Sequence, residues 1–415
     1  MAHESSNLFD IFRERGFFKQ CTSDEVVRGM FSAGPVVAYI GFDPTARSLH
    51  AGSLVPIMAL MHMERTGHHP IALVGGGTGL VGDPSGKTEQ RQILTRDDLR
   101  SNFDAIKAQI GRFLDIDGGQ SIAVDNADWL EKLNYIEFLR DIGRHFSVNR
   151  MLSFESYRIR LQKGLSFLEF NYQLLQAYDF LVLFQRHGCR LQMGGDDQWG
   201  NIVAGTELIR RVEGVDAHGL TFPLLETASG AKMGKTAKGA LWLDPKLTSP
   251  YEYYQYWVNT DDRDVGRFLR LFTFLPMDEV RRLETLAGEE AREAKRILAF
   301  EATSVCHGAV AAEAARDGAA AAFGGADGAS DGIPTTRLSR ERVEHGVRAT
   351  ELFVEIGLMS SKGEAAKLFK AGGGWIGERQ LRDHNEVVGI TDFPGGEALV
   401  RAGRKHRHRL VLEDQ

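Results

Sequence analysis

Hydrophobic and polar positions in the first half of the chain predict strands and helices in alternation. Short apolar runs that are typical of buried strands lie at 36–42, 70–75, 121–124 and 190–194. Segments with a helical spacing of apolar residues lie between them, at 54–66, 95–113 and 136–144. This alternation predicts βαβ units and therefore an α/β fold with a Rossmann-like, doubly wound parallel sheet. Ligands of such sheets bind at the carboxyl ends of the strands.

The second half of the chain has a different pattern. Positions from 249 to about 316 have helical apolar faces, and 314–336 is rich in Ala, Gly and Asp. We therefore expect an α/β domain, a helical domain, a linker and a small α+β module, at 1–246, 247–316, 317–343 and 344–415.

The composition is that of an ordinary soluble globular protein, with 43% hydrophobic and 26% charged residues. No apolar run approaches the roughly 20 residues that span a bilayer, and the N-terminus has no signal-peptide pattern, so we expect no membrane association. The three cysteines are scattered. They favour a reducing, cytoplasmic compartment, with no disulfide framework and no metal site built on cysteine.

The net charge of −6 is unevenly distributed along the chain. Residues 337–415 contain 14 Lys/Arg against 12 Asp/Glu, or +2, which leaves −8 for the rest. Basic residues concentrate near the end, at Arg401, Arg404, Lys405, Arg407 and Arg409. Such a patch can follow nucleic-acid phosphates, although charge alone favours a solvated tail.

Two glycine-rich stretches imitate nucleotide-binding signatures. The segment 77–82 matches G-x-G-x-x-G, but it lies in the second βα unit, whereas the dinucleotide fingerprint belongs in the first. The segment 82–88 resembles a Walker A loop but has three residues between its glycines instead of four. We reject both signatures. The second stretch still supplies Asp83 and, with the residues after it, the cations Lys87 and Arg91.

Two other segments indicate phosphate chemistry. In 39–54 an apolar run ends in a Gly/Asp/Pro turn, and a hydroxyl, an imidazole and a glycine then precede a helical pattern. This order of strand, turn and helix presents backbone N–H groups and a positive helix end to phosphate. The loop 231–236 contains two lysines among small residues. Together the segments suggest ATP chemistry without a P-loop.

A polar trio lies in the otherwise apolar helical segment 171–179. Steps of four and three place Tyr172, Gln176 and Asp179 on one helical face. Taken alone, the trio fits a satisfied buried network and a ligand site equally well.

Five blocks in register resemble bacterial-type tyrosyl-tRNA synthetases, which are class I aminoacyl-tRNA synthetases. The blocks are 39–54, 75–91, 171–179, 194–201 and 232–236. The resemblance implies that the first domain is catalytic and that the enzyme activates L-tyrosine with ATP, forming tyrosyl-adenylate and diphosphate. It also implies transfer of tyrosine to the 3′ end of tRNA(Tyr), a homodimer, and Mg²⁺ as the companion of ATP.

The resemblance implies three sets of site residues. The catalytic set is Thr45, His50, Lys87, Arg91, Lys232, Lys235 and Thr236. The ATP-binding set is Gly41, Asp43, His50, Gly52, Ser53, Gly195, Asp197 and Lys235. The tyrosine set is Asp83, Tyr172 and Gln176 at the α-ammonium group, Tyr39 and Asp179 at the phenolic hydroxyl, and Gln198 near the carboxylate.

Two positions depart from the family pattern. Ser53 stands where the signature after His50 has a second histidine, and Asp196 stands where a serine usually precedes the aspartate of the ribose site. A tandem Asp pair alone would suggest a metal site. The Asp196 departure also adds a negative charge directly beside Asp197.

The last module resembles an S4-type RNA-binding domain, with a small helix pair and a basic β-hairpin that read RNA shape and phosphates. The anticodon arm of tRNA(Tyr) is the implied target.

Three other functions remain open at this stage. A tryptophanyl enzyme shares the sheet and the lysine loop, but it gives no reason for Tyr39 with Asp179. An RNA-binding regulator without activity would not need Thr45 and His50. A nucleotidyltransferase making a small-molecule cofactor would not need the S4-like module.

Overall fold

The computed structural model describes residues 7–85, 94–230, 233–236, 239–324, 334–403 and 406–413. The chain divides into two compact units. The first comprises Met1–Gly234, Trp242–Asp244 and Gly266–Arg282, and the second comprises Lys235–Leu241, Pro245–Val265 and Leu283–Gln415. No helix among the described residues is long and apolar enough to cross a membrane.

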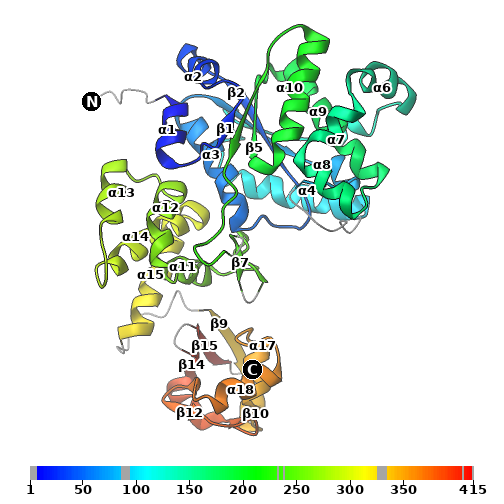
Figure 1. Ribbon diagram of the computed structural model, residues 1–415. Helices are drawn as coiled ribbons and strands as arrows, with labels where there is room; N and C mark the ends of the chain where they lie inside the picture. The colour runs from blue at the N-terminus through cyan, green and yellow to red at the C-terminus, as the bar shows by residue number, and fades with distance from the viewer. Residues whose placement is uncertain are drawn as a thin grey trace. The chain divides into compact units, whose positions relative to one another are not determined.

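The described part of the first unit contains a six-stranded sheet (Figure 1). Its strands are β1 (Gln20–Cys21), β2 (Val37–Phe42), β3 (His69–Val74), β4 (Ile122–Asp125), β5 (Leu191–Gly195) and β6 (His218–Phe222). Their order is β1-β6-β5-β2-β3-β4, with β1 antiparallel to β6 and every other pair parallel. The order reverses between β2 and β5, and this switch point of a doubly wound sheet is where ligands bind. The predicted fold class is confirmed.

Helices connect the strands and cover the sheet. They are α1 (Leu8–Arg15), α2 (Asp24–Ala33), α3 (Leu54–Arg65), α4 (Arg96–Ile110), α5 (Ala127–Leu130), α6 (Tyr135–Asp141), α7 (Val148–Ser153), α8 (Glu155–Lys163), α9 (Phe167–His187) and α10 (Trp199–Glu213). Short 3₁₀ turns lie at η1 (Ala51–Ser53), η2 (Thr78–Leu80), η3 (Gly143–His145) and η4 (Asp196–Gln198). The four strands and three helices predicted from periodicity are all present, with boundaries shifted by a few residues. The short strands β1 and β6 were not predicted.

Local sequence explains where α9 begins and which sides it buries. Ser166 and Glu169 form a reciprocal capping box at its N-terminus, and Gly188 ends it in a left-handed conformation. The helix packs against α10, and its apolar residues, Phe180 and Leu183 among them, join the core behind β2 and β3. Burial of each such side chain contributes about 1.5–3 kcal/mol. The same helix presents the predicted polar trio.

The second unit begins with the hairpin β7 (Lys235–Thr236) and β8 (Gly239–Ala240). Its helices are α11 (Pro250–Val258), α14 (Ala291–His307) and α15 (Ala309–Gly324), which pack against one another, while α12 (Asp262–Phe272) and α13 (Met277–Glu284) fall wholly or partly in the first unit. Helix α15 ends, and the next strand begins, inside the range predicted as a linker. The three boundaries between the four predicted segments stay a prediction.

The C-terminal residues of the second unit form a small α+β module. A five-stranded sheet is found among its described residues, in the order β12-β11-β14-β15-β9. The strands of this sheet are β9 (Thr335–Ser339), β11 (Gly374–Ile376), β12 (Arg379–Leu381), β14 (Glu397–Ala402) and β15 (His406–Glu413), while β10 (Val347–Arg348) and β13 (Val387–Val388) form a separate antiparallel pair. The helices are α16 (Arg340–Glu344), α17 (Ala349–Glu355) and α18 (Lys362–Lys370), with turns η5 (Ile390–Asp392) and η6 (Pro394–Gly396). One apolar core, which includes Phe353 and Phe369, joins both layers.

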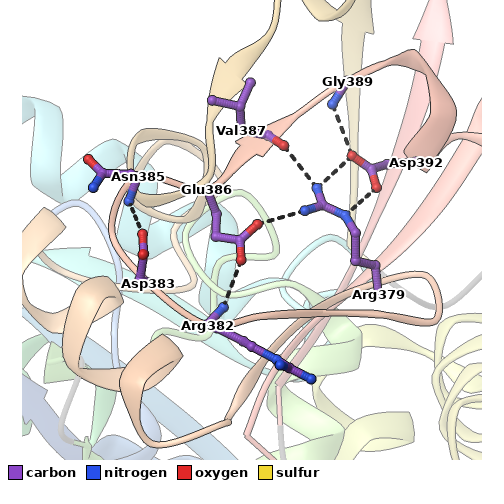
Figure 2. Close-up of polar contacts among 8 residues, drawn as sticks. All are labelled: Arg379, Arg382, Asp383, Asn385, Glu386, Val387, Gly389 and Asp392. Carbon is purple, nitrogen blue, oxygen red and sulfur yellow. Dashed lines mark hydrogen bonds and ion pairs between the residues drawn. The ribbon is translucent and has the colours of Figure 1, made fainter.

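An arginine organises the loop between β12 and η5 (Figure 2). The Arg379 guanidinium donates to both carboxylate oxygens of Asp392 at 2.7 and 2.8 Å, to Glu386 at 2.7 Å, and to the carbonyl oxygen of Val387 at 2.9 Å. Asp392 also accepts from the Gly389 amide at 2.9 Å. Two carboxylates therefore compensate this cation, and its planar donor set fixes the loop.

Candidate active site

The predicted site residues gather where the segments after β2, β3 and β5 meet. These segments leave the carboxyl ends of neighbouring parallel strands, and β2 and β5 flank the switch point. Helix α9 supplies the remaining side chains. The elements therefore converge from four separate parts of the sequence.

The deep end of the site is a phenol beside a carboxylate. Tyr39 is 1% exposed and Asp179 is 2% exposed. The Tyr39 hydroxyl has no hydrogen-bond partner among the described residues. The Asp179 carboxylate accepts from Asn126 Nδ2 at 2.9 Å and from Trp129 Nε1 at 2.7 Å. A buried hydroxyl without a partner is costly, so this end of the site suits a ligand that has a hydroxyl of its own.

Burial controls the protonation of this pair. It raises the pKa of Asp179 to about 7, against the opposing effect of the hydrogen bonds from Asn126 and Trp129. Burial, and secondly the charge of Asp179, raises the pKa of Tyr39 well above its usual value. The ring of Phe180, the residue after Asp179, lies 5.3 Å from the Tyr39 ring, so this turn of α9 packs against Tyr39. At neutral pH Tyr39 is therefore a neutral hydroxyl that can both donate and accept.

A second buried carboxylate, Asp83, lies in the segment after β3. Asp83 accepts from the Ser85 amide at 2.9 Å and from Gln198 Nε2 at 2.7 Å. Burial, and then the charge of Asp43, raises its pKa to about 6. The Gln198 carbonyl in turn accepts from Asn201 Nδ2 at 3.1 Å. The structure thus brings together Asp83 and Gln198, two members of the predicted tyrosine set.

Helix α9 aligns the rest of that set. Tyr172 and Asp179 are buried and Gln176 is half-buried, and the helical steps place all three on one face. The Gln173 side chain, on another face, donates to the carbonyl oxygen of Gly200 at 3.0 Å and so joins α9 to α10.

The two segments predicted to bind ATP also lie against each other. His50 Nδ1 accepts from the Gly52 amide at 3.0 Å, which leaves Nε2 to bear the proton of the neutral ring. A Cβ added at Gly52 would lie 2.7 Å from the His50 ring and 3.2 Å from the carbonyl oxygen of Met233. Gly234 has φ of +80°, and a Cβ there would lie 2.7 Å from the Gly52 amide nitrogen. Both glycines are therefore required by close approach.

The segment predicted to bind the ribose follows β5. Burial, and then the charges of Asp43 and Asp196, raises the pKa of Asp197. A Cβ at Gly195 would lie 2.6 Å from Asp197 Oδ1, so a side chain at this position would displace the carboxylate from its present place. The Asp196 carboxylate has different partners, because its Oδ1 accepts from Gln20 Nε2 at 2.7 Å and from Thr221 Oγ1 at 2.8 Å.

The remaining predicted site residues are either exposed or half-buried, or lie partly or wholly outside the described residues. Thr45 and His50 are exposed, Gly41 is exposed, and Asp43 and Ser53 are half-buried. Lys87, Arg91 and Lys232 lie outside the described residues. Lys235 and Thr236 are described as the backbone of β7, without their side chains.

Sequence reasoning missed the residues that support the site from the end of β4. Besides binding Asp179, the Asn126 amide accepts from the backbone amides of Gly77 and Thr78 at 2.8 and 3.3 Å and donates to Thr78 Oγ1 at 2.9 Å. Those loop amides belong to the G-x-G-x-x-G segment, and they donate to a protein side chain, in agreement with the rejection of a dinucleotide site. A signal was present, because Asn126 directly follows a strand at its carboxyl end.

This arrangement, a doubly wound sheet with a histidine–glycine turn after its first parallel strand, is typical of the class I aminoacyl-tRNA synthetases. The family model for tRNA synthetases class I (W and Y) matches residues 32–324. The chain belongs to this family and is an aminoacyl-tRNA ligase.

Similar curated proteins indicate which amino acid the enzyme attaches to tRNA. Proteins named tyrosine–tRNA ligase are 54% identical in Desulfatibacillum aliphaticivorans, over 99% of this chain and 99% of the relative, and 50% identical in Clostridium tetani, over 98% and 100%. A C-terminally truncated mitochondrial tyrosyl-tRNA synthetase of Aspergillus nidulans superposes with a TM-score of 0.69 at 29% identity, over 77% of this chain and 94% of that one. The tyrosine–tRNA ligase function predicted from the sequence is confirmed.

Proposed function

We propose that tyrosine and ATP bind side by side at the switch point between β2 and β5, where the protein makes tyrosyl-adenylate and then esterifies the 3′ end of tRNA(Tyr). The observation that supports this assignment best is the buried pair of Tyr39 and Asp179. It suits a substrate hydroxyl at the closed end of the site.

The buried pair of Tyr39 and Asp179 accounts for the selectivity for tyrosine over phenylalanine. The tyrosine hydroxyl donates to Asp179 and accepts from Tyr39, whereas phenylalanine leaves both buried groups without that bond. Tyrosyl-tRNA synthetases are themselves the established example of this discrimination, so its size is not a new prediction. Asp83 and Gln198 then hold the amino-acid end through charge and hydrogen bonds, together with Tyr172 and Gln176.

The ATP end acts by position and electrostatics. The tyrosine carboxylate attacks the α-phosphorus, the bond to the bridging oxygen breaks, and diphosphate leaves. His50 Nε2 and the Thr45 hydroxyl donate to phosphate oxygens more strongly as charge accumulates on them. Asp197 binds the ribose hydroxyls, and the cations Lys87, Arg91, Lys232 and Lys235, with Thr236, stabilise the leaving diphosphate.

Mg²⁺ enters with ATP as a bridging ion. The described residues contain no group of three or more His, Cys, Asp or Glu side chains that could hold a metal. Coordination of Mg²⁺ mainly by phosphate oxygens and water is its usual mode in nucleotide sites.

The C-terminal module binds the tRNA. Its β-hairpin contains Arg401, whose guanidinium lies 4.8 Å from the centre of the Trp375 ring. A stacked pair of this kind can receive a nucleotide base or a phosphate. Arg404 and Lys405 of the predicted basic patch lie outside the described residues.

The protein works as a homodimer in the cytoplasm. Large apolar side chains are exposed on the neighbouring helices α6 to α9, where Ile136 is 70% exposed, Val148 55%, Leu161 56% and Phe167 71%. A face of this kind on one subunit is typical of an interface. Phe167→Asp should convert the dimer into a monomer in light scattering, and an unchanged mass would place the interface elsewhere.

One measurement tests the proposed function. The purified protein should catalyse ATP–diphosphate exchange with tyrosine and not with the other amino acids. Exchange driven by tryptophan would indicate the other branch of the family, and no exchange with any amino acid would contradict the assignment.

A further inference from the structure

The turn after β5 has a connection that the substrate roles do not explain. Asp196 is the first residue of η4, directly before Asp197 and Gln198. One oxygen of its carboxylate, Oδ1, accepts two hydrogen bonds, from Gln20 Nε2 at 2.7 Å and from Thr221 Oγ1 at 2.8 Å.

The two donors belong to one pair of directly opposed residues in the sheet. Gln20 and Thr221 are directly paired across the antiparallel strands β1 and β6. Thr221 is fully buried, and its carbonyl oxygen accepts from the Lys19 amide at 2.9 Å. Asp196 therefore joins the turn to a rigid part of the sheet that lies outside the switch point. Both hydrogen bonds end on one oxygen atom, which can accept two donors at once.

The two residues after Asp196 depend on this connection to different degrees. Gln198 has bonds of its own to Asp83 and to Asn201 at 2.7 and 3.1 Å. Asp197 has a longer bond, at 3.5 Å from Gln198 Nε2. A loosened turn should thus displace Asp197 more than Gln198.

We propose that Asp196 is a positioning residue that fixes the turn through Gln20 and Thr221 and thereby orients Asp197 toward the nucleoside part of ATP. The inference rests on the proposed function, in which Asp197 binds the ribose. It assigns a role in ATP binding to β1, a strand of two residues that is 176 positions away in the sequence.

The test compares four variants of the full-length protein in tyrosine-dependent ATP–diphosphate exchange. Asp196→Ala removes the acceptor, Gln20→Ala removes one donor, and the double variant removes both sides of the bond. Asp196→Asn keeps an acceptor oxygen without the charge. Gln185→Ala is the matched control, because Gln185 donates to Glu213 at 2.7 Å in the same kind of bond outside the site.

We expect Gln20→Ala and Asp196→Ala to raise the KM for ATP by roughly two- to tenfold, which is what the loss of one or two net hydrogen bonds amounts to. The KM for tyrosine should change less than twofold, and the double variant should be no worse than Asp196→Ala. Asp196→Asn and Gln185→Ala should remain within about twofold of the wild type for both substrates.

Other results overturn the inference. Equal changes in the KM for ATP and the KM for tyrosine would indicate general damage to the protein. Additive effects of Gln20→Ala and Asp196→Ala in the double variant would show that the two residues act separately. An Asp196→Asn variant as impaired as Asp196→Ala would mean that the charge of Asp196, and not its hydrogen bonds, is what matters. If Asp196→Ala fails to fold, Gln20→Ala alone still decides the question through the two KM values. A wild-type protein without tyrosine-dependent exchange would instead contradict the proposed function.

Discussion

Replacement of Asp179 by asparagine tests the closed end of the site. The carboxylate accepts from Asn126 and Trp129, and in the proposed complex it also accepts from the tyrosine hydroxyl. An asparagine has nearly the same shape but only one oxygen. One of the three donors therefore loses its acceptor, and the charge that strengthens all three bonds is gone.

The size of the effect follows from the bond that is lost. A hydrogen bond to a charged acceptor is worth about 1.5–3 kcal/mol, and about 1.4 kcal/mol corresponds to a factor of ten. The kcat/KM for tyrosine in ATP–diphosphate exchange should thus fall roughly 10- to 150-fold. Phenylalanine does not form the bond, so its much smaller kcat/KM should change little.

The assay measures kcat/KM for both amino acids with the same enzyme preparation. Asp128→Asn is the matched control, since Asp128 lies in the same short helix as Trp129 but is exposed. Equal losses for tyrosine and phenylalanine would refute the reasoning, because they would mean that Asp179 supports the fold and does not contact the hydroxyl.

The Asp179→Asn variant should also change how the stability of the fold depends on pH. Burial raises the pKa of Asp179 to about 7 in the folded protein, whereas an unfolded chain has a value of about 3.9. Between these pH values the folded state holds a proton that the unfolded state has lost, so this group makes the fold less stable as the pH rises. Urea unfolding at each pH gives the free energy of unfolding of both proteins. The value for Asp179→Asn minus the value for the wild type should increase from pH 5 to pH 7. A difference that decreases would contradict the assignment.

Three further outcomes are expected. Gly52→Ala should lower the adenylation rate at least about tenfold in stopped-flow fluorescence, because the added methyl group would meet the His50 ring; an unchanged rate would show that the turn has room. Arg160→Met should cost about 3–5 kcal/mol in unfolding experiments, since it leaves Glu169 buried without the partner now 2.8 Å away, and adding Glu169→Gln should recover part of the loss. Arg379→Ala should weaken tRNA binding in filter assays by several-fold without affecting tyrosine-dependent exchange, and a loss of exchange would place its effect outside the C-terminal module.

The sequence predicted the elements that have a strong period. Buried runs gave β2 to β5 to within a residue or two, and the helical face of α9 was correct because its polar residues recur at steps of four and three. Strands β1 and β6 were missed. The first has only two residues, too few for any period, and its pairing partner lies at the far end of the domain sequence.

The residues predicted to contact ligands could be named from the sequence, and those contacts stay a prediction, whereas the supporting residues could not be named. Tyr39 and Asp179 followed from recognised motifs, whereas nothing local in the sequence indicates that Asn126 bonds simultaneously to Asp179 and to the loop after β3. The orientation of Asp196 is a similar case. Its donors come from residues 20 and 221, and only the folded sheet brings them to one atom.

The ion pairs of the C-terminal module affect how its attraction for RNA should be counted. Of the 14 cations from Arg337 onward, 12 lie among the described residues, and at least five of these have carboxylate partners: Arg337, Arg342, Lys362, Arg379 and Arg409. The salt dependence of RNA affinity measures only cations that replace counterions on phosphates. A plot of log affinity against log salt concentration should therefore give a slope well below the one expected if all 14 cations contacted phosphates, with recognition depending more on shape than on electrostatic attraction.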